Sequence, residues 1–395
     1  MVCVNPFVSA QCRRELVTWL SRLIAARTEN PPGNESLACD VIEEVVRPWG
    51  LAGERHASQP GRDNLILRVG AGRPRLAVAI HTDVVPAGDG WGQDPFAAQE
   101  KDGRLYGRGA SDDKGPLAAM LLVVRELKRR EADLKGQLLL AAVADEEAGS
   151  THGVEFLLAN GHLQADMAII PDAASHMEKV MVAEKGALFV QLTSLGTQAH
   201  GSRPEKGFNA IWPLLRALEL LREMPRAAAF HDLLSPPTMN LGVIQGGAAP
   251  NIVPARATAR VDFRYLPGER SVDILDAIRG RLARVREEEP KARLGVEVLS
   301  DLPATEVRRD SPLVAAIQQA AGEVSGKVPV AAGMSGATVA KQFLAHGIPA
   351  VGFAPGEGDA AHTANEYVEI DELVAFAGVM LRVVHLLVGG STKAP

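Results

Sequence analysis

Short, continuously apolar runs alternate with segments of helical periodicity along most of this chain. The runs are "NLILRV" (64–69), "LAVAI" (76–80), "QLLLAAVA" (137–144), "MAIIP" (167–171) and "PAVGFA" (349–354). Between and around them, apolar residues recur at helical spacing over 13–27, 36–49, 116–130, 153–159, 313–324, 338–345 and 372–388. Strands that are apolar at every position are covered on both faces, which is typical of a parallel sheet flanked by helices. The sequence therefore predicts an α/β fold with a mostly parallel sheet.

The pattern changes over residues 185–301. The run "ALFVQLTSL" (187–195) alternates between apolar and polar residues, as an antiparallel strand with one solvated face does. It is followed by a predicted helix, two strands, a helix and a strand, at 208–223, 238–246, 257–266, 272–286 and 294–299. This β-α-β-β-α-β order is typical of a ferredoxin-like α+β domain. We therefore predict one α/β domain, formed by 1–184 and 302–395, with an α+β domain inserted at 185–301.

Charge and composition exclude several classes of protein. The formal net charge is −6 and no basic stripe with interleaved aromatic residues is present, so no nucleic-acid partner is expected. The longest apolar runs are too short to span a membrane, and the first residues lack the basic start and apolar run of a signal peptide. The three cysteines, Cys3, Cys12 and Cys39, show no C-x-x-C spacing and predict neither a disulfide framework nor a cysteine metal site. A cytoplasmic location is expected.

Polar side chains follow the apolar strands at the points where these strands end. His81 and Asp83 follow "LAVAI", Glu146 and Glu147 follow "QLLLAAVA", and Asp172 follows "MAIIP". Two further candidates are His362, after "PAVGFA", and Asp112, at a turn before the helix that starts near 116. Ligands of open α/β sheets bind outside the carboxyl ends of the strands. We therefore expect these side chains to share one edge of one sheet.

Each of these residues alone also has an ordinary structural interpretation. Asp112 or its neighbour Asp113 could cap the following helix. Glu146 and Glu147 fit a solvated loop, and His362 fits a surface histidine. Taken together, two imidazoles and several carboxylates at one sheet edge form a mixed nitrogen and oxygen ligand set. Such a set suits zinc, cobalt or manganese, and one carboxylate can bridge two ions about 3.5–4 Å apart.

Six motifs now identify a family that the chain resembles. They are "HTDVVPAGDGWGQDPF", "GRGASDDKGPLAAM", "DEEAGSTHG", "AHGSRPEKGFNAI", "NIVPARATARVDFRYLPG" and "GDAAHTANEYV". In type and order they resemble the metallopeptidase family of succinyl-diaminopimelate desuccinylase, acetylornithine deacetylase, aminoacylase, glutamate carboxypeptidase and the carnosinase-like dipeptidases. The resemblance covers residues 16–384 and implies a dinuclear metallohydrolase domain with an inserted dimerisation or lid domain.

The resemblance implies a role for each candidate ligand. His81 and Asp172 would bind one divalent ion, and Glu147 and His362 would bind a second. Asp112 would bridge both ions and be followed by a non-proline cis peptide bond. The implied cofactor is two divalent ions per subunit, with zinc expected and cobalt or manganese as alternatives.

The same resemblance implies the catalytic groups. Glu146 would act as the general base and acid, taking a proton from the attacking water and returning it to the leaving amine. Asp83 would accept a hydrogen bond from the free ring nitrogen of His81 and so fix the tautomer of that imidazole. The predicted reaction is hydrolysis of an amide bond in a small peptide, such as a dipeptide, or in an N-acyl amino acid.

Four residues outside the ligand set are implied to contact the substrate. His200 would reach the active site of the partner subunit in a homodimer that forms through the inserted domain. Asn251, Arg264 and Gly336 match substrate-binding positions of the family, and Arg264 would bind a substrate carboxylate. On the residues alone, His200 also fits a surface loop, and Arg264 also fits a salt bridge on the face of a strand.

Two departures from the family pattern bear on the substrate. The loop "GMSGATVAKQF" has Val339 where the family often has Asp, and Lys341 where it has Arg. Asp172 stands where deacylases and carboxypeptidases more often have Glu, which favours a dipeptidase. The alternatives are an acetyl- or succinyl-amino-acid deacylase and, more remotely, a non-catalytic homologue that binds amino acids. The intact ligand set argues against the last of these.

Overall fold

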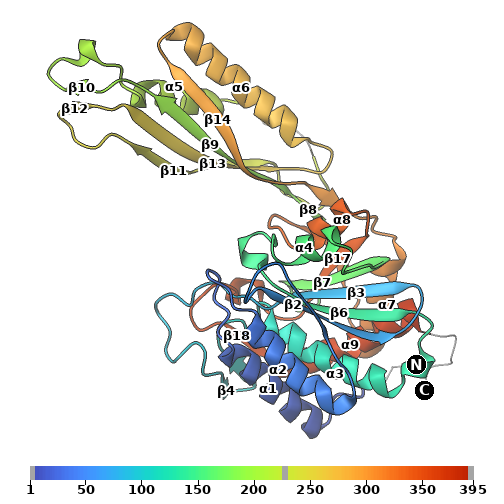
Figure 1. The fold of residues 1–395 in the computed structure, drawn as a ribbon. Coiled ribbons are helices and arrows are strands. Elements are labelled where there is room, and N and C mark those ends of the chain that lie inside the picture. Colours follow the sequence, from blue (N-terminus) through green and yellow to red (C-terminus); the bar gives the residue numbers. More distant parts are fainter. Residues whose placement is uncertain (1–4, 225–229, 390–395) are drawn as a thin grey trace. The chain divides into compact units, whose positions relative to one another are not determined.

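The computed structural model describes residues 5–224 and 230–389 of the 395-residue chain, so Cys3 lies outside the described residues. The chain forms two compact units (Figure 1). Unit 1 comprises 1–182, 307–332 and 338–395, and unit 2 comprises 183–306 and 333–337. Compared with the predicted insertion at 185–301, unit 2 begins two residues earlier and ends five residues later. It also takes in 333–337, a segment that we had assigned to the α/β domain.

Unit 1 is built on a sheet whose strands run in the order β1-β2-β6-β3-β7-β17-β8, with β16 paired to β8. The four central strands, β6, β3, β7 and β17, are parallel neighbours, and β1, β2 and β8 add in antiparallel fashion. The strands are β1 (Glu54–Ala57), β2 (Asp63–Gly70), β3 (Arg75–His81), β6 (Gln137–Val143), β7 (Met167–Ala174), β8 (Lys179–Glu184), β16 (Val330–Met334) and β17 (Ala350–Ala354). The predicted mostly parallel sheet is confirmed.

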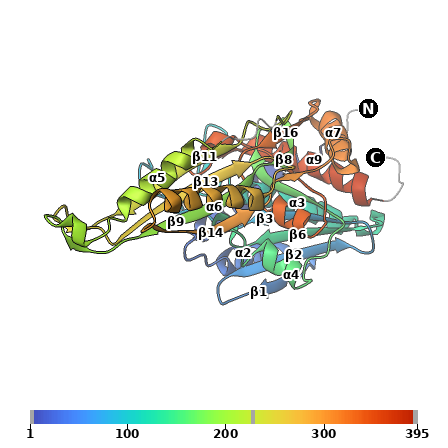
Figure 2. The same ribbon diagram turned by 90° about the horizontal axis from the view of Figure 1, so that it is seen from above.

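Helices cover both faces of this sheet, which explains why the central strands are apolar at every position. On one face, α4 and α8 pack against β2, β3, β6 and β7 in a core that includes Val143, Leu157 and Phe343. On the other face, α3 and α9 contact the sheet, and α7 lies beside α9 (Figure 2). The helices are α1 (Ala10–Ala25), α2 (Ser36–Val46), α3 (Lys114–Arg129), α4 (Val154–Ala159), α7 (Pro312–Ser325), α8 (Ala340–Ala345) and α9 (Ile370–Val388).

The helix boundaries follow from capping residues in the sequence. Ser9 caps α1, since its hydroxyl accepts a hydrogen bond of 3.2 Å from the backbone nitrogen of Cys12. Ser311 caps α7 in the same way, with Pro312 at the first helical position. That helix ends at Gly326, which has φ 74°, a backbone conformation that glycine adopts at little cost.

Unit 2 contains a four-stranded antiparallel sheet in the order β11-β13-β9-β14. Its elements are β9 (Gly186–Leu195), α5 (Ile211–Arg222), β11 (Thr238–Gly246), β13 (Arg256–Tyr265), α6 (Ser271–Glu288) and β14 (Arg293–Leu302). The two helices pack on one face, where Leu188, Leu214, Phe263 and Ile278 share a core. The order along the chain is the predicted β-α-β-β-α-β, and the strand order is that of a ferredoxin-like fold.

Several short strands were not predicted. In unit 1, β4 (Gln99–Lys101), β5 (Arg104–Tyr106) and β18 (Tyr367–Glu369) form a three-stranded sheet. In unit 2, β10 (Ala199–His200) pairs with β12 (Ile252–Val253), and β15 (Thr305–Glu306) pairs with the end of β8. Strands of two or three residues are too short to show a period in the sequence. No helix within 5–224 or 230–389 is both long enough and apolar enough to cross a membrane.

Candidate metal centre

Three of the five predicted ligands lie in or shortly after the carboxyl halves of parallel strands of unit 1, whereas Asp112 and His362 lie in loops. His81 is the last residue of β3, and Asp172 lies in the final half of β7. Glu146 and Glu147 open a short 3-10 helix (Glu146–Ala148) directly after β6. Because neighbouring parallel strands end at the same edge of a sheet, their polar residues meet there. The fold therefore explains why residues far apart in the sequence converge on one site.

Asp112 lies between two histidines. Its Oδ1 is 2.8 Å from Nε2 of His81, and its Oδ2 is 3.1 Å from Nε2 of His362. The same His362 nitrogen is 3.1 Å from Oε1 of Glu147. The peptide bond between Asp112 and Asp113 is cis, as the resemblance implied. A carboxylate whose two oxygens face two different imidazoles has the arrangement that a ligand shared by two ions requires.

Two overlapping groups of side chains are close enough to hold an ion each. His81, Asp112 and Glu147 form one group, and His81, Glu146 and Asp172 form the other, with the ligand atoms of each group within 4.8 Å of one another. His362 joins the first group through its contacts with Asp112 and Glu147. All five predicted ligands thus lie together, and Glu146, predicted as the base, also lies within ligand distance.

Crowding of carboxylates in a buried site perturbs the acids of this cluster. Burial raises the pKa of Glu146 to about 8, with further increases from Glu147 and Asp112. Burial likewise raises the pKa of Asp172 well above its usual value, as do the charges of Glu146 and Asp112. Hydrogen bonds to Asp112 and Glu147 raise the pKa of the His362 imidazole to about 10. A bound cation would compensate the charge of these crowded carboxylates and favour their ionised forms.

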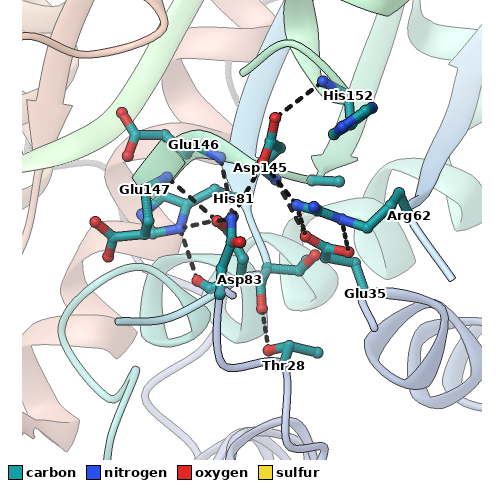
Figure 3. Close-up of polar contacts among 12 residues, drawn as sticks. Thr28, Glu35, Arg62, His81, Asp83, Asp145, Glu146, Glu147 and His152 are labelled. Carbon is teal, nitrogen blue, oxygen red and sulfur yellow. Dashed lines mark hydrogen bonds and ion pairs between the residues drawn. The ribbon is translucent and has the colours of Figure 1, made fainter. Parts of the chain in front are cut away.

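Asp83 differs in detail from the prediction. Nδ1 of His81 lies 2.9 Å from the backbone carbonyl oxygen of Asp83, whereas the nearest carboxylate oxygen of Asp83 is 3.6 Å away. The carboxylate itself accepts hydrogen bonds from the backbone nitrogens of Glu146 (3.1 Å) and Glu147 (3.2 Å). Asp83 therefore contacts the imidazole through its main chain and the Glu146–Glu147 turn through its side chain (Figure 3).

Comparison with known proteins shows which family the chain belongs to. Residues 77–386 match the model of peptidase family M20/M25/M40. The chain belongs to this family. In sequence, the M20 chain is 33% identical to an acetylornithine deacetylase of Myxococcus xanthus over 329 residues, covering 81% of this chain and 82% of that protein. It is 28% identical to a probable succinyl-diaminopimelate desuccinylase of Staphylococcus epidermidis, covering 93% and 96%.

The fold of the M20 chain is also that of solved peptidase structures. The aminopeptidase PepT of Bacillus cereus matches with a TM-score of 0.78 at 23% identity, over 95% of this chain and 98% of that chain. Human carnosine dipeptidase 1 matches with a TM-score of 0.72 at 19% identity, over 94% and 96%. At these identities the likeness shows a shared fold.

The four residues predicted to contact substrate all belong to unit 2. His200 is exposed, and its Nδ1 accepts a hydrogen bond of 3.1 Å from the backbone nitrogen of Ser202. Asn251 lies close by, because its backbone oxygen accepts a 2.7 Å hydrogen bond from Gly201. Arg264 lies on β13, with its Nε 2.9 Å from Oδ1 of Asp262. The structure thus brings His200 and Asn251 together and pairs Arg264 with a neighbouring carboxylate.

The last candidate loop divides between the two units. Gly336 belongs to unit 2, within 333–337. Val339, at the place where the family often has Asp, belongs to unit 1 and is only 2% exposed. It packs with Ala340, Phe343 and other apolar side chains in the core under α8. The departure at Val339 thus replaces a polar group by a core residue.

Glu366 is a supporting residue of this M20 site that we did not predict. It is 1% exposed, and its carboxylate accepts four hydrogen bonds. Oε2 accepts from Nη1 of Arg108 (2.8 Å) and the backbone nitrogen of Gly109 (3.0 Å), and Oε1 from the backbone nitrogens of Ser111 (2.8 Å) and Asp112 (3.1 Å). Glu366 thus holds the backbone of the Asp112 loop from a position four residues after His362. The "HTANE" spacing was the only signal for it.

Replacing Glu366 with Gln should weaken metal binding by about 10–100-fold, the range measured for residues that orient metal ligands. The amide has the shape of the carboxylate, but one of its two ends must face hydrogen-bond donors with an NH₂ group. Metal affinity measured by competition with a chelator tests this. Glu369→Gln, on the exposed end of β18, is the matched control and should bind metal as the wild type does. Equal affinities for all three proteins would contradict the prediction.

Proposed function

We propose that this M20 chain is a dinuclear metal-dependent hydrolase that cleaves the amide bond of a small peptide or an N-acyl amino acid. The observation that carries the proposal is the convergence of five proposed ligand side chains and Glu146 at one sheet edge, where His81 is buried and His362 is exposed. A protein that only bound amino acids would have no need for a general base beside such a ligand set. The M20 homology supports hydrolysis.

The donor set fits divalent ions of the zinc type. Two imidazoles and three carboxylates provide the mixed nitrogen and oxygen ligands that zinc, cobalt and manganese accept. His81 and Asp172 would hold one ion and Glu147 and His362 the other, with Asp112 shared. A divalent ion supplies Lewis acidity, lowering the pKa of water toward about 7 and polarising the scissile carbonyl.

Glu146 is the proton carrier in the proposed reaction. Its carboxylate accepts a proton from the water whose oxygen forms the new bond to the amide carbon. As the carbon–nitrogen bond breaks, Glu146 returns that proton to the leaving nitrogen. Burial is the main cause of the raised pKa of Glu146, and the charges of Glu147 and Asp112 raise it further. Because those two carboxylates are proposed ligands, bound ions would offset their charge and favour the ionised form of Glu146.

Two observations point to different substrates. Asp172, in place of the more usual Glu of deacylases, favours a dipeptide. Sequence similarity to an acetylornithine deacetylase and a succinyl-diaminopimelate desuccinylase favours an acetyl- or succinyl-amino acid. The chain spans more than four-fifths of each of these relatives, so the similarity includes both units.

Release of free amine from two pools of compounds separates the two substrates. One pool holds unblocked dipeptides and the other acetyl-, succinyl- and carbamoyl-amino acids, each tested with zinc- and with cobalt-loaded enzyme. We expect turnover in one pool, and turnover lower by roughly 10²-fold or more with Glu146→Ala, which serves as the blank. Turnover of dipeptides alone would establish a dipeptidase, and turnover of blocked amino acids alone would establish a deacylase. Turnover in neither pool would contradict the proposed function.

We also propose that the protein is a homodimer that assembles through unit 2. The outer strand β11 exposes Leu241, Val243 and Ile244, and the neighbouring helix α5 exposes Trp212 and Leu215. Both elements line one apolar groove, which supports an interface between copies. The proposed role of His200 in the active site of the partner requires such a dimer. A cytoplasmic location stays a prediction.

Hybrid dimers test the shared site. His200→Ala and Glu146→Ala subunits are each expected to be inactive alone. In a mixture, a hybrid dimer has one active site with both intact residues, so up to about one quarter of wild-type activity should return. Hybrids shown by differential tagging to form, yet without activity, would argue that His200 does not act across the interface.

A further inference from the structure

A buried arginine lies behind the Glu146–Glu147 turn, outside the candidate ligand set. Arg62 donates from Nε to Oε2 of Glu35 at 2.8 Å and from Nη2 to Oε1 of Glu35 at 2.7 Å (Figure 3). The Arg62 side chain is 8% exposed and that of Glu35 is fully buried. A buried ion pair is weak evidence for stability, so stability alone does not explain this pair.

The same guanidinium also binds Asp145, the residue immediately before Glu146. Nη2 of Arg62 is 2.7 Å from Oδ1 of Asp145. The other carboxylate oxygen, Oδ2, accepts a 3.0 Å hydrogen bond from the backbone nitrogen of His152, and the backbone nitrogen of Asp145 donates to Glu35. Asp145 has φ 64°, a left-handed conformation that is uncommon for a residue other than glycine. Arg62 and Glu35 thus hold both the side chain and the main chain of this residue.

Asn30 connects these contacts to those of Asp83. Its Nδ2 donates to Oδ1 of Asp145 at 3.1 Å and to Oδ2 of Asp83 at 2.9 Å. The Asp83 carboxylate accepts from the backbone nitrogens of Glu146 and Glu147. The turn that carries the Glu146 and Glu147 carboxylates is therefore fixed at two places. Asp83 accepts hydrogen bonds from its backbone nitrogens, and the neighbouring Asp145 is bound by Arg62 and Asn30.

The space around Arg62 leaves this arrangement little freedom. A Cβ atom added to Gly33 would lie 2.5 Å from Nε of Arg62 and 2.9 Å from Oε2 of Glu35, closer than non-bonded atoms approach. Gly33 also has φ 103°, which a residue with a side chain rarely adopts. The backbone of Gly33 thus packs directly against the Arg62–Glu35 pair and confines it.

We propose that Arg62, oriented by Glu35, is a positioning residue that acts through Asp145 to hold Glu146 and Glu147 in place. The expected effect of Arg62 on catalytic rate rests on the proposed function, whereas its effect on the conformation of the Glu146–Glu147 turn does not. Arginine is required because its planar fork reaches two carboxylates at once, whereas a lysine ammonium is a point donor on a flexible stem. Arg62→Lys keeps the buried charge and loses this geometry.

Kinetics of Arg62→Lys supply the first test. We expect kcat to fall at least tenfold with KM within threefold of wild type, since the turn carries the base rather than a substrate contact. Arg55→Lys is the matched control. Arg55 also forms a fork with a carboxylate, Glu43, at 3.0 and 2.9 Å, but its other carboxylate partners are Asp40 and Asp63, and its side chain is partly exposed. Its kcat should stay within twofold. Equal losses in both variants would overturn the proposal.

A double-mutant cycle tests the route through Asp145. If Arg62 acts through this residue, Arg62→Lys combined with Asp145→Asn should lower kcat no further than the more damaging single change. Arg55→Lys combined with Asp145→Asn should give the product of the two single effects. Multiplicative losses for Arg62 and Asp145 would overturn the proposal.

Hydrogen–deuterium exchange of the metal-free protein tests the turn without any substrate. Amides in 145–150 should exchange at least tenfold faster in Arg62→Lys and in Glu35→Gln than in wild type or Arg55→Lys. Glu35→Gln keeps the guanidinium and serves if Arg62→Lys fails to fold. Unchanged exchange in whichever variants fold overturns the proposal. If the protein turns over neither substrate pool, the proposed function fails. Faster amide exchange in 145–150 of the variants would still support the positioning role of Arg62.

Discussion

Glu146→Ala should bind two divalent ions and yet lose roughly 10²–10⁴-fold in kcat, the contribution typical of a positioned general base. The reason is that the five proposed ligands remain, while the proposed proton carrier is removed. KM should change little, because the substitution removes a group that acts in the transition state. Turnover of the substrate found in the amine-release experiment, measured with zinc and with cobalt, checks this.

Metal content decides what a loss of activity in Glu146→Ala means. Glu146 lies within ligand distance of His81 and Asp172, so the distances alone do not separate a base from a ligand. If the inactive variant still binds two ions per subunit, Glu146 transfers protons and is not a metal ligand. One ion per subunit would place it among the ligands. Glu155→Ala, an exposed carboxylate on α4, is the control and should retain both ions and full activity.

His81→Ala should release metal and activity together. His81 is 1% exposed and belongs to both candidate ion groups, where it contacts Asp112, the proposed shared ligand, so its loss should affect both proposed ion positions. Metal affinity should fall by more than the roughly 10–100-fold that the loss of a merely supporting residue costs. Metal analysis after dialysis against a weak chelator, with activity measured on the same sample, tests the coupling.

His176 provides the matched control for His81. It also contacts two carboxylates, Glu372 at 3.0 Å and Glu357 at 3.1 Å, but it lies outside both candidate ion groups. His176→Ala should keep its metal. Retention of metal by His81→Ala, or an equal loss from both variants, would remove His81 from the ligand set.

The ligands were predictable because their positions follow from strand direction. A wholly apolar run such as 76–80 identifies a covered parallel strand, and the residue after it must lie at the carboxyl edge. His81, Glu147 and Asp172 could therefore be grouped before any distance was known. Their division between two ions and the role of Glu146 came from the family resemblance and stay proposals.

The supporting residues were not predictable, because their function depends on what they touch across long stretches of sequence. Glu366 contacts residues near 110, and Arg62 contacts Asp145, more than 80 positions away. In the sequence, Arg62 is a charged residue in a loop, and "NPPGNE" (30–35) reads only as the end of a helix. These residues matter because they are buried and bonded in the folded chain. Burial at loop positions leaves no periodic pattern of apolar residues in the sequence.

Unit 1 is discontinuous, and this determines when its site can be completed during synthesis. Four of the five proposed ligands precede unit 2 in the chain, while His362 and the supporting Glu366 follow it. Strand β17, which pairs with β7 in the middle of the sheet, is also made after unit 2. A ribosome-bound chain that has emerged through residue 306 therefore has β7 paired with β3 on one side only, and its cluster of carboxylates lacks the second histidine. Unit 2 is continuous apart from 333–337, so high-affinity binding of both ions should begin only after residues 362–366 have emerged from the ribosome.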